Sequence, residues 1–153
     1  GLPLLLRFPD AVRPWQHVLE CLSGYLWLGA RLWQGDGGLN GEAFNFGPDA
    51  GDSQTVAGLL GGMADRWPGA RWRILEGCDQ GGDEARLLKL SCDKALFHLN
   101  WRAVLPFPET VAFTMDWYRA WHEGGRDLYG FTVEQIERYC QAAGTRGGAW
   151  IQP

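Results

Sequence analysis

The chain has 153 residues and a formal net charge of −4, and this length suits one domain or a large part of a two-lobed one. Hydrophobic residues make up 46% and charged residues 21%, which excludes a disordered chain outside a short tail. The acidic balance argues against a nucleic-acid partner, because phosphate binding by a protein surface requires clustered positive charge.

Strands and helices are predicted to alternate in the first half of the chain. The expected elements are a strand over 2–7, a helix over 17–33, a strand over 43–46, a helix capped by Ser53, and a strand over 71–75. The helix over 17–33 has apolar residues near helical spacing, at Val18, Leu22, Tyr25, Leu26, Leu28 and Leu32. This spacing predicts that one face of the helix is apolar.

The second half predicts shorter elements and two clear helices. The expected elements are a strand over 86–90, a short helix over 93–99, a helix over 108–122, and a last helix through Ile136 to Cys140. The spacing Thr132-x-x-Gln135 is a capping-box signature and predicts the start of that last helix. The glycine-rich tail, residues 144–153, is expected to be disordered.

This order of elements predicts an α/β architecture. We expect a parallel pair between the strands 2–7 and 43–46, joined by the helix 17–33 as a right-handed crossover. The short elements after residue 70 predict a small capping lobe. Nine tryptophans are more than a freestanding domain of this size needs, so part of this apolar surface is expected to face a further lobe.

The cysteines and the apolar runs predict the compartment. Cys21, Cys78, Cys92 and Cys140 have no paired spacing and no ligand-spaced histidines near them, so we expect no metal site and a cytoplasmic location. No apolar run approaches the roughly 20 residues of a membrane span, and we expect no membrane contact.

Arg13 follows an expected strand and precedes an expected helix. A guanidinium beside the unpaired N–H groups of a helix start is suited to bind a diphosphate. Two alternatives remain for this side chain: it anchors a turn, or it pairs with Asp10. His17, at the helix start, is expected to be a structural hydrogen-bonding residue.

The run from Arg13 to Glu20, RPWQHVLE, closely resembles one stretch of the CDP-glucose 4,6-dehydratases, in the extended short-chain dehydrogenase superfamily. Four further segments resemble that family in the same order: 44–48 (FNFGP), 88–95 (LKLSCDKA), 99–101 (LNW) and 114–118 (TMDWY). Five segments in register indicate relatedness over most of the chain.

The resemblance implies that residues 1–153 form the C-terminal, substrate-binding half of an NAD-dependent sugar-nucleotide dehydratase. The implied fold is the C-terminal part of an extended short-chain dehydrogenase, with parallel-sheet strands, helices and a small substrate-binding lobe. The family oxidises C4 of CDP-glucose with NAD, eliminates water across C5 and C6, and returns the hydride to C6. The implied product is CDP-4-keto-6-deoxyglucose, a precursor of deoxysugars.

The sequence contains neither the G-x-G-x-x-G motif nor a Tyr-x-x-x-Lys pair. The resemblance therefore assigns NAD and the catalytic residues to a missing N-terminal half. We expect no catalytic residue in this chain and no activity from it alone. Its first residue is Gly rather than Met, which adds to the expectation of a start further upstream.

The resemblance also implies a set of substrate-binding residues. Arg13 aligns with the arginine that pairs with the diphosphate in related sugar-nucleotide enzymes. Glu84 is placed to accept hydrogen bonds from ribose hydroxyls, and Asp83 stands where the family has a histidine. Leu6 and Phe8, at the end of the first strand, are expected to pack against the base.

The expected partners are a nucleotide-sugar substrate and the missing NAD-binding half. A half-enzyme exposes apolar faces, so we expect the isolated chain to be poorly soluble or a homo-oligomer. Two alternatives stay open. One is a non-catalytic remnant or nucleotide-sugar binding module, and the other is a related NAD-dependent epimerase or dehydratase for a different sugar nucleotide.

Overall fold

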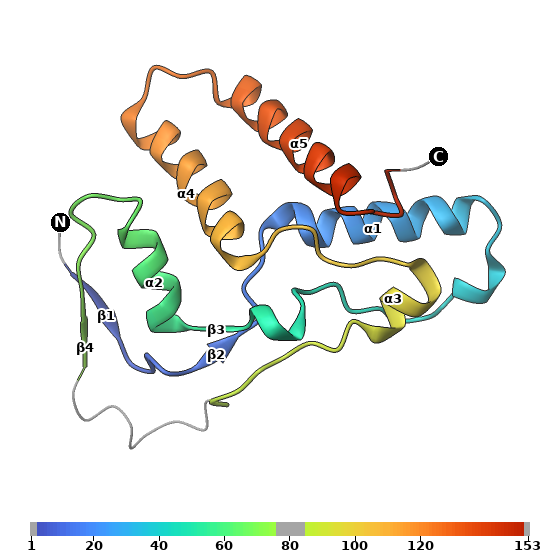
Figure 1. The fold of residues 1–153 in the computed structure, drawn as a ribbon, viewed down its shortest axis with the longest axis horizontal. Helices are drawn as coiled ribbons and strands as arrows, with labels where there is room; N and C mark the ends of the chain where they lie inside the picture. Colours follow the sequence, from blue (N-terminus) through green and yellow to red (C-terminus); the bar gives the residue numbers. More distant parts are fainter. Residues whose placement is uncertain (1–2, 76–84, 152–153) are drawn as a thin grey trace.

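The computed structural model describes residues 3–75 and 85–151. The two small sheets lie to one side of the molecule, at the lower left in Figure 1, and most of the helices lie above and to the right of them. In chain order the elements are β1 (Leu4–Leu6), β2 (Val12–Arg13), α1 (Val18–Trp33), η1 (Gly37–Leu39), η2 (Ala50–Asp52), β3 (Gln54–Thr55), α2 (Val56–Ala64), β4 (Trp72–Ile74), α3 (Asp93–Leu99), α4 (Phe107–Glu123) and α5 (Leu128–Thr145).

The two sheets contain two strands each. Strand β1 pairs in parallel with β4, with Leu4 opposite Trp72, and β2 pairs antiparallel with β3. The expected α/β composition and the strand over 71–75 are therefore confirmed. The expected pairing of 2–7 with 43–46 is wrong, because β4 is the partner of β1 and residues 43–46 form no strand. Among the described residues, the main chain of 43–46 makes no hydrogen bond to another main chain.

Two further predictions, about a strand and about a helix cap, differ from the structure. The strand over 86–90 is reduced to a single parallel bridge between Leu87 and Val12. Helix α2 is capped by Thr55 rather than Ser53, and the Thr55 Oγ1 accepts the Gly58 N–H at 3.0 Å. Thr55 is the last extended residue before the helix, so its hydroxyl reaches the first free amides.

The last helix begins one turn earlier than its capping-box signature predicts. Asp127 caps α5 by accepting the Tyr129 N–H at 3.0 Å. Thr132 lies inside the helix and donates to the Leu128 carbonyl at 2.7 Å. Gln135 does not return to the helix start, because its amide nitrogen donates to the Phe113 carbonyl of α4 at 2.7 Å. The expected helices over 17–33, 93–99 and 108–122 are confirmed.

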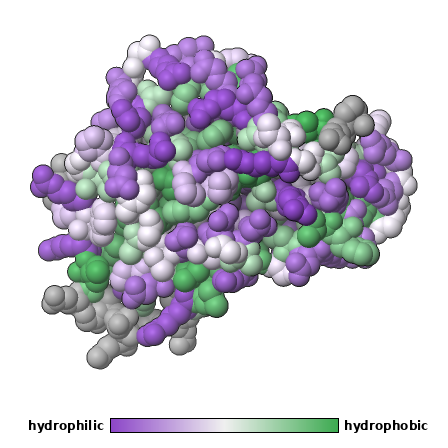
Figure 2. All heavy atoms as spheres, in the orientation of Figure 1, coloured by the Kyte–Doolittle hydropathy of each residue, from purple (hydrophilic) through white to green (hydrophobic). Residues whose placement is uncertain are grey.

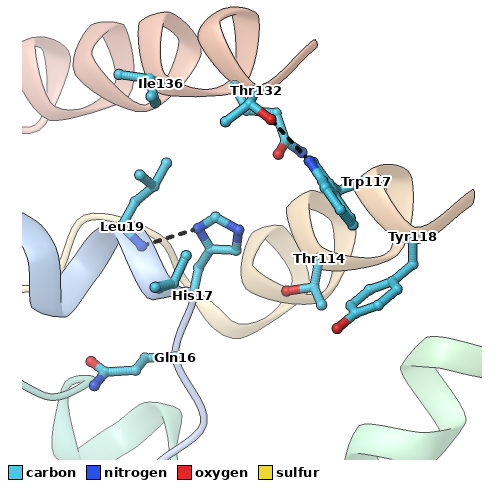
Figure 3. A pocket seen from close by; sticks show the side chains of 10 residues that line it. Gln16, His17, Leu19, Thr114, Trp117, Tyr118, Thr132 and Ile136 are labelled. Atoms are coloured by element: carbon cyan, nitrogen blue, oxygen red, sulfur yellow. Dashed lines mark hydrogen bonds between the residues drawn. The ribbon is translucent and has the colours of Figure 1, made fainter. Parts of the chain in front are cut away.

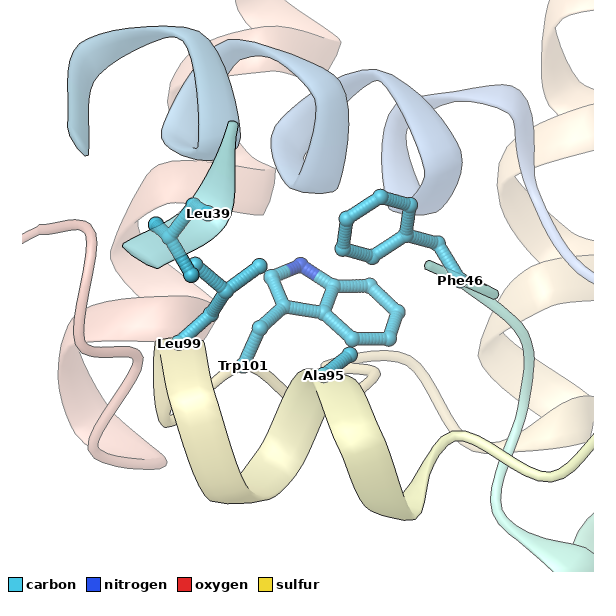
Figure 4. Close-up of a cluster of buried hydrophobic side chains, with 5 residues drawn as sticks. All are labelled: Leu39, Phe46, Ala95, Leu99 and Trp101. Carbon is cyan, nitrogen blue, oxygen red and sulfur yellow. The ribbon is translucent and has the colours of Figure 1, made fainter. Parts of the chain in front are cut away.

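Helix α1 lies between two buried clusters. One, beneath it in Figure 4, consists of Leu39, Phe46, Ala95, Leu99 and Trp101. The other lies toward the α4–α5 hairpin and consists of Val104, Leu105, Phe113, Tyr139 and Ala143. Trp150 packs against both clusters. The two clusters place the start of α1 beside α4 and α5.

The buried face of α1 is not its apolar face. Glu20, Ser23 and Gly24 are its buried residues, while Leu22 and Leu26 are exposed. Most of the predicted apolar face points to solvent, and of its members Leu28 packs against the first cluster. Figure 2 shows hydrophobic residues at the surface between the polar ones.

After α5 the chain turns back toward the core. The Trp150 ring stacks on Tyr139 with centroids 5.4 Å apart, within the segment 144–153 that was expected to be disordered. In the described ranges, none of the helices has both the length and the apolar character needed to cross a bilayer.

Candidate functional site

Arg13 lies on β2, between β3 and the chain that follows residue 84. On one side of β2, Arg13 is paired with Gln54. On the other side, the Val12 N–H donates to the Arg86 carbonyl at 2.8 Å. The Arg13 Nη1 donates to the Val12 carbonyl at 2.8 Å and to the Ala85 carbonyl at 2.9 Å. The guanidinium is thus held where two segments 72 residues apart in the sequence meet.

Two of the predicted substrate contacts, Asp83 and Glu84, lie outside the described residues. Ala85 is the first described residue after them, and the structure brings it into hydrogen-bond contact with Arg13. Leu6 is buried at the end of β1. Phe8 is half-buried, with the Arg7 guanidinium 5.8 Å from its ring centroid. A turn closed by the Ala11 N–H and the Phe8 carbonyl connects Phe8 to β2.

His17 caps α1 and borders a cavity of about 380 Å³ between α1, α4 and α5 (Figure 3). Its Nδ1 accepts the Leu19 N–H at 3.4 Å, which confirms the structural role expected for this histidine. Burial lowers the pKa of His17, so the neutral ring carries its proton on Nε2. The cavity is also lined by Trp117 and Tyr118. None of the described residues that line it is charged, so the cavity suits an uncharged group and not a phosphate.

Glu20 joins three segments inside the protein. Its side chain accepts the Val104 N–H at 3.0 Å and the Leu105 N–H at 2.6 Å. It also accepts the Tyr139 hydroxyl at 2.9 Å. Tyr139 lies 3.0 Å from the Ser23 Oγ, so α1, α5 and the chain before α4 meet at one carboxylate. We call Glu20, Ser23, Tyr139 and the amides of Val104 and Leu105 the Glu20 network.

Burial sets the protonation of the Glu20 network. Glu20 is 1% exposed, and removal of water raises its pKa, although the hydrogen bonds from the amides and Tyr139 oppose this rise. Burial, followed by the neighbouring Glu20 charge, raises the pKa of Tyr139. The phenol therefore stays protonated and acts as a donor to the carboxylate.

Sequence reasoning missed the Glu20 network, although one signal pointed to it. Glu20, Ser23, Gly24 and Trp27 have i, i+3, i+4 and i+7 spacing, so they share one helix face. A helix face that carries a carboxylate, a hydroxyl and a glycine can be buried against polar groups, or it can be exposed to solvent. Because most acidic residues are exposed, the pattern favoured the wrong face.

No protein-family model matches the chain. The chain is 36% identical over 140 residues to the CDP-glucose 4,6-dehydratase of Salmonella typhimurium (strain LT2). This similarity covers 91% of the chain but only 38% of the relative. The chain is therefore related to a sugar-nucleotide dehydratase. More particularly, the resemblance to the CDP-glucose 4,6-dehydratases that its motifs predicted is confirmed.

Proposed function

We propose that the chain is the substrate-binding portion of a CDP-glucose 4,6-dehydratase-like enzyme, and that Arg13 binds the diphosphate of CDP-glucose. The observation that carries the proposal is the position of Arg13. It lies within the RPWQHVLE motif, just before α1, and its guanidinium is held at the meeting point of β2 and residue 85. A guanidinium held in one orientation in this way loses little side-chain entropy when it binds a phosphate.

In support of this assignment, the cavity beside His17 has no charged side chain among its described lining residues, so it is poorly suited to a phosphate. The end of β1 and the turn that contains Phe8 lead along the chain into β2, which carries Arg13. These are the places where we propose that Leu6 and Phe8 contact the base. Asp83 and Glu84 remain proposed neighbours of the ribose.

The relative's reaction depends on NAD, and the residues of this chain do not fit that cofactor. The nearest match to the dinucleotide motif begins at Gly35, at the end of α1, and leads into η1. A dinucleotide site requires the opposite order, a strand followed by the N-terminus of a helix. We therefore propose that NAD and the catalytic acid and base come from the remainder of a longer enzyme, and that this chain contributes substrate binding only.

The test is calorimetric titration of CDP-glucose into the chain and into its Arg13→Ala variant. Loss of a charge-assisted contact to phosphate is expected to weaken binding about 10- to 100-fold. Arg73→Ala is the matched control, since Arg73 lies on β4 and is exposed, and its affinity should not change. Thermal unfolding of each variant separates loss of contact from loss of fold.

Three outcomes would contradict the proposal. Equal affinity of the chain and of Arg13→Ala removes Arg13 from the site. Equal affinity for UDP-, dTDP- and GDP-glucose removes the preference for CDP-glucose and favours a related epimerase or dehydratase. If CDP-glucose releases no heat with any variant, the non-catalytic remnant becomes the better interpretation.

A further inference from the structure

The cavity between the start of α1 and the α4–α5 hairpin has the size of a ligand site (Figure 3). Its volume of about 380 Å³ lies within the roughly 300–1,000 Å³ that is usual for small-molecule pockets. Its wall includes His17 and Gln135, which are only 8% and 3% exposed. It is also lined by exposed residues, among them Tyr118 and Ile136. The cavity thus leads from the surface to two buried polar side chains.

His17 directs one N–H group into this cavity. Its Nδ1 accepts the Leu19 N–H at 3.4 Å, and burial lowers the pKa of His17, so the neutral ring carries its proton on Nε2. Figure 3 shows Nε2 on the side of the ring that faces Thr114 and Trp117. No residue in the described ranges accepts a hydrogen bond from it.

Gln135 supplies the complementary acceptor. Its amide nitrogen donates to the Phe113 carbonyl at 2.7 Å, which leaves Oε1 as an acceptor. Within the described part of the chain, no donor reaches this oxygen. Both Gln135 Oε1 and His17 Nε2 retain access to open space, unlike the fully buried Oε1 of Gln16. The cavity therefore offers one N–H donor and one carbonyl acceptor to a ligand.

Neighbouring polar groups of the wall already have partners. The Trp117 Nε1 donates to the Thr132 Oγ1 at 3.0 Å. The hydroxyls of Thr114 and Thr132 each donate to the carbonyl four residues earlier, at 2.9 and 2.7 Å. The Tyr118 hydroxyl belongs to an exposed residue, where water satisfies it. The two buried groups are therefore the ones that a ligand would pair.

Two aromatic rings complete the wall. Trp117 and Tyr118 have ring centroids 5.6 Å apart and planes at 84°. A flat ring that stacks on one of them meets the edge of the other, and both arrangements are favourable for aromatic groups.

We propose that this cavity binds a flat, uncharged ring with a carbonyl and an N–H group on its edge, as in the pyrimidine base uracil. The carbonyl of the ligand accepts from His17 Nε2, its N–H group donates to Gln135 Oε1, and its face stacks on the aromatic pair. Arg13 does not line this cavity, so the site is separate from the proposed diphosphate contact.

Other classes of ligand match the wall less well. A phosphate or a carboxylate would lose water without gaining a counter-ion, because none of the described lining residues is charged. A sugar would bring many hydroxyls to a wall with one available buried donor and one available buried acceptor. A saturated hydrocarbon would leave His17 Nε2 and Gln135 Oε1 buried without partners, which is unfavourable.

The experiment is ligand-observed NMR of the chain with 2-pyridone, a small ring that carries this edge. Its N-methyl derivative has the same ring and carbonyl but lacks the N–H group. We expect 2-pyridone to bind at millimolar concentration and the N-methyl derivative to bind at least about tenfold more weakly, because Gln135 Oε1 then meets a methyl group. This comparison uses the unaltered chain, so it does not depend on the folding of a variant.

A substitution tests the donor. His17→Asn removes the Nε2 donor but keeps a side-chain oxygen suited to the helix cap, and it should weaken 2-pyridone binding about tenfold. His98→Asn is the matched control, since His98 is exposed on α3 and outside the cavity lining, and its binding should be unchanged. Thermal unfolding shows whether each variant keeps its fold. Arg13→Ala should also bind 2-pyridone normally, which separates this site from the proposed function.

Four results would overturn the proposal. They are no binding of 2-pyridone, equal binding of its N-methyl derivative, unchanged binding by a folded His17→Asn variant, and displacement of 2-pyridone by glucose more readily than by uracil. Competition by uracil but not by uridine monophosphate would identify a free base as the ligand. Competition by both would identify the base of a nucleotide.

Discussion

Glu20 shows how one side chain can connect distant parts of a chain. It lies on the first turn of α1, and its partners Val104 and Tyr139 are 84 and 119 residues away. The carboxylate satisfies two main-chain amides that have lost their water, and it therefore fixes the chain before α4 against α1. Buried donors left without an acceptor cost about 1–3 kcal/mol each.

We predict that Glu20→Ala lowers the free energy of unfolding by about 3 kcal/mol or more, because it leaves the Val104 and Leu105 amides and the Tyr139 hydroxyl without their acceptor. Urea unfolding followed by tryptophan fluorescence measures the change. Ser91→Ala is the control, since the Ser91 hydroxyl donates to Asp93 at an exposed position. A loss below about 1 kcal/mol for Glu20→Ala would contradict the role given to the network.

Glu20 also predicts a direction of pH dependence. Its pKa is raised in the folded protein, so the folded state binds this proton more tightly than the unfolded chain does. The stabilising contribution is complete below the unfolded pKa and is lost as pH rises through the folded pKa. We expect the stability difference between the chain and Glu20→Gln to change in that direction across pH 4–8, as measured by urea midpoints. A difference that rises with pH would contradict the assignment.

At the scale of the element, α1 carries glycines on opposite sides for different reasons. A methyl group built on Gly24 would lie 2.3 Å from the Phe46 ring, whereas one on Gly29 would have nothing within 4 Å. Gly24 thus allows the close approach of the helix and residues 43–46. Gly29 is exposed and has no such constraint.

This contrast predicts opposite effects from the same substitution. Gly24→Ala should lower the free energy of unfolding by about 1–3 kcal/mol through overpacking against Phe46. Gly29→Ala should raise it by about 0.5–1 kcal/mol, because alanine favours the helix more than glycine does. Chemical denaturation of both variants measures the pair. Equal effects would show that Gly24 is not in close contact with residues 43–46.

At the scale of the whole molecule, Trp150 joins the two buried clusters. Its ring stacks on Tyr139 and packs against both groups of side chains that flank α1. Its indole Nε1 is buried and has no hydrogen-bond partner among the residues that the structure describes. The contribution of Trp150 therefore comes from packing and not from its polar atom.

We predict that Trp150→Ala lowers the free energy of unfolding by about 3 kcal/mol, since it opens space between the clusters. Trp150→Phe should cost less than about 1 kcal/mol, because it retains an aromatic ring and removes an unsatisfied N–H group. Thermal and urea unfolding compare the two variants. A larger loss for Trp150→Phe would indicate that the indole nitrogen has a partner.

Local patterns determined the helices, because spacing and caps act within a few residues. The helix over 93–99 has the predicted bounds, and the helix expected over 17–33 is found at Val18–Trp33. The motif around Arg13 also led to the related enzyme, because relatedness is recorded in residue identities whatever their surroundings.

Strand pairing and burial were decided by the tertiary structure. The partner of β1 is 68 residues away along the chain at Leu4 and Trp72, and no local pattern specifies which strand pairs with which. The side of α1 that faces inward depends on whether Val104, Leu105 and Tyr139 surround Glu20. The spacing of hydrophobic residues cannot reveal which side of α1 is buried. A buried carboxylate is favourable only where donors from distant parts of the chain form hydrogen bonds with it.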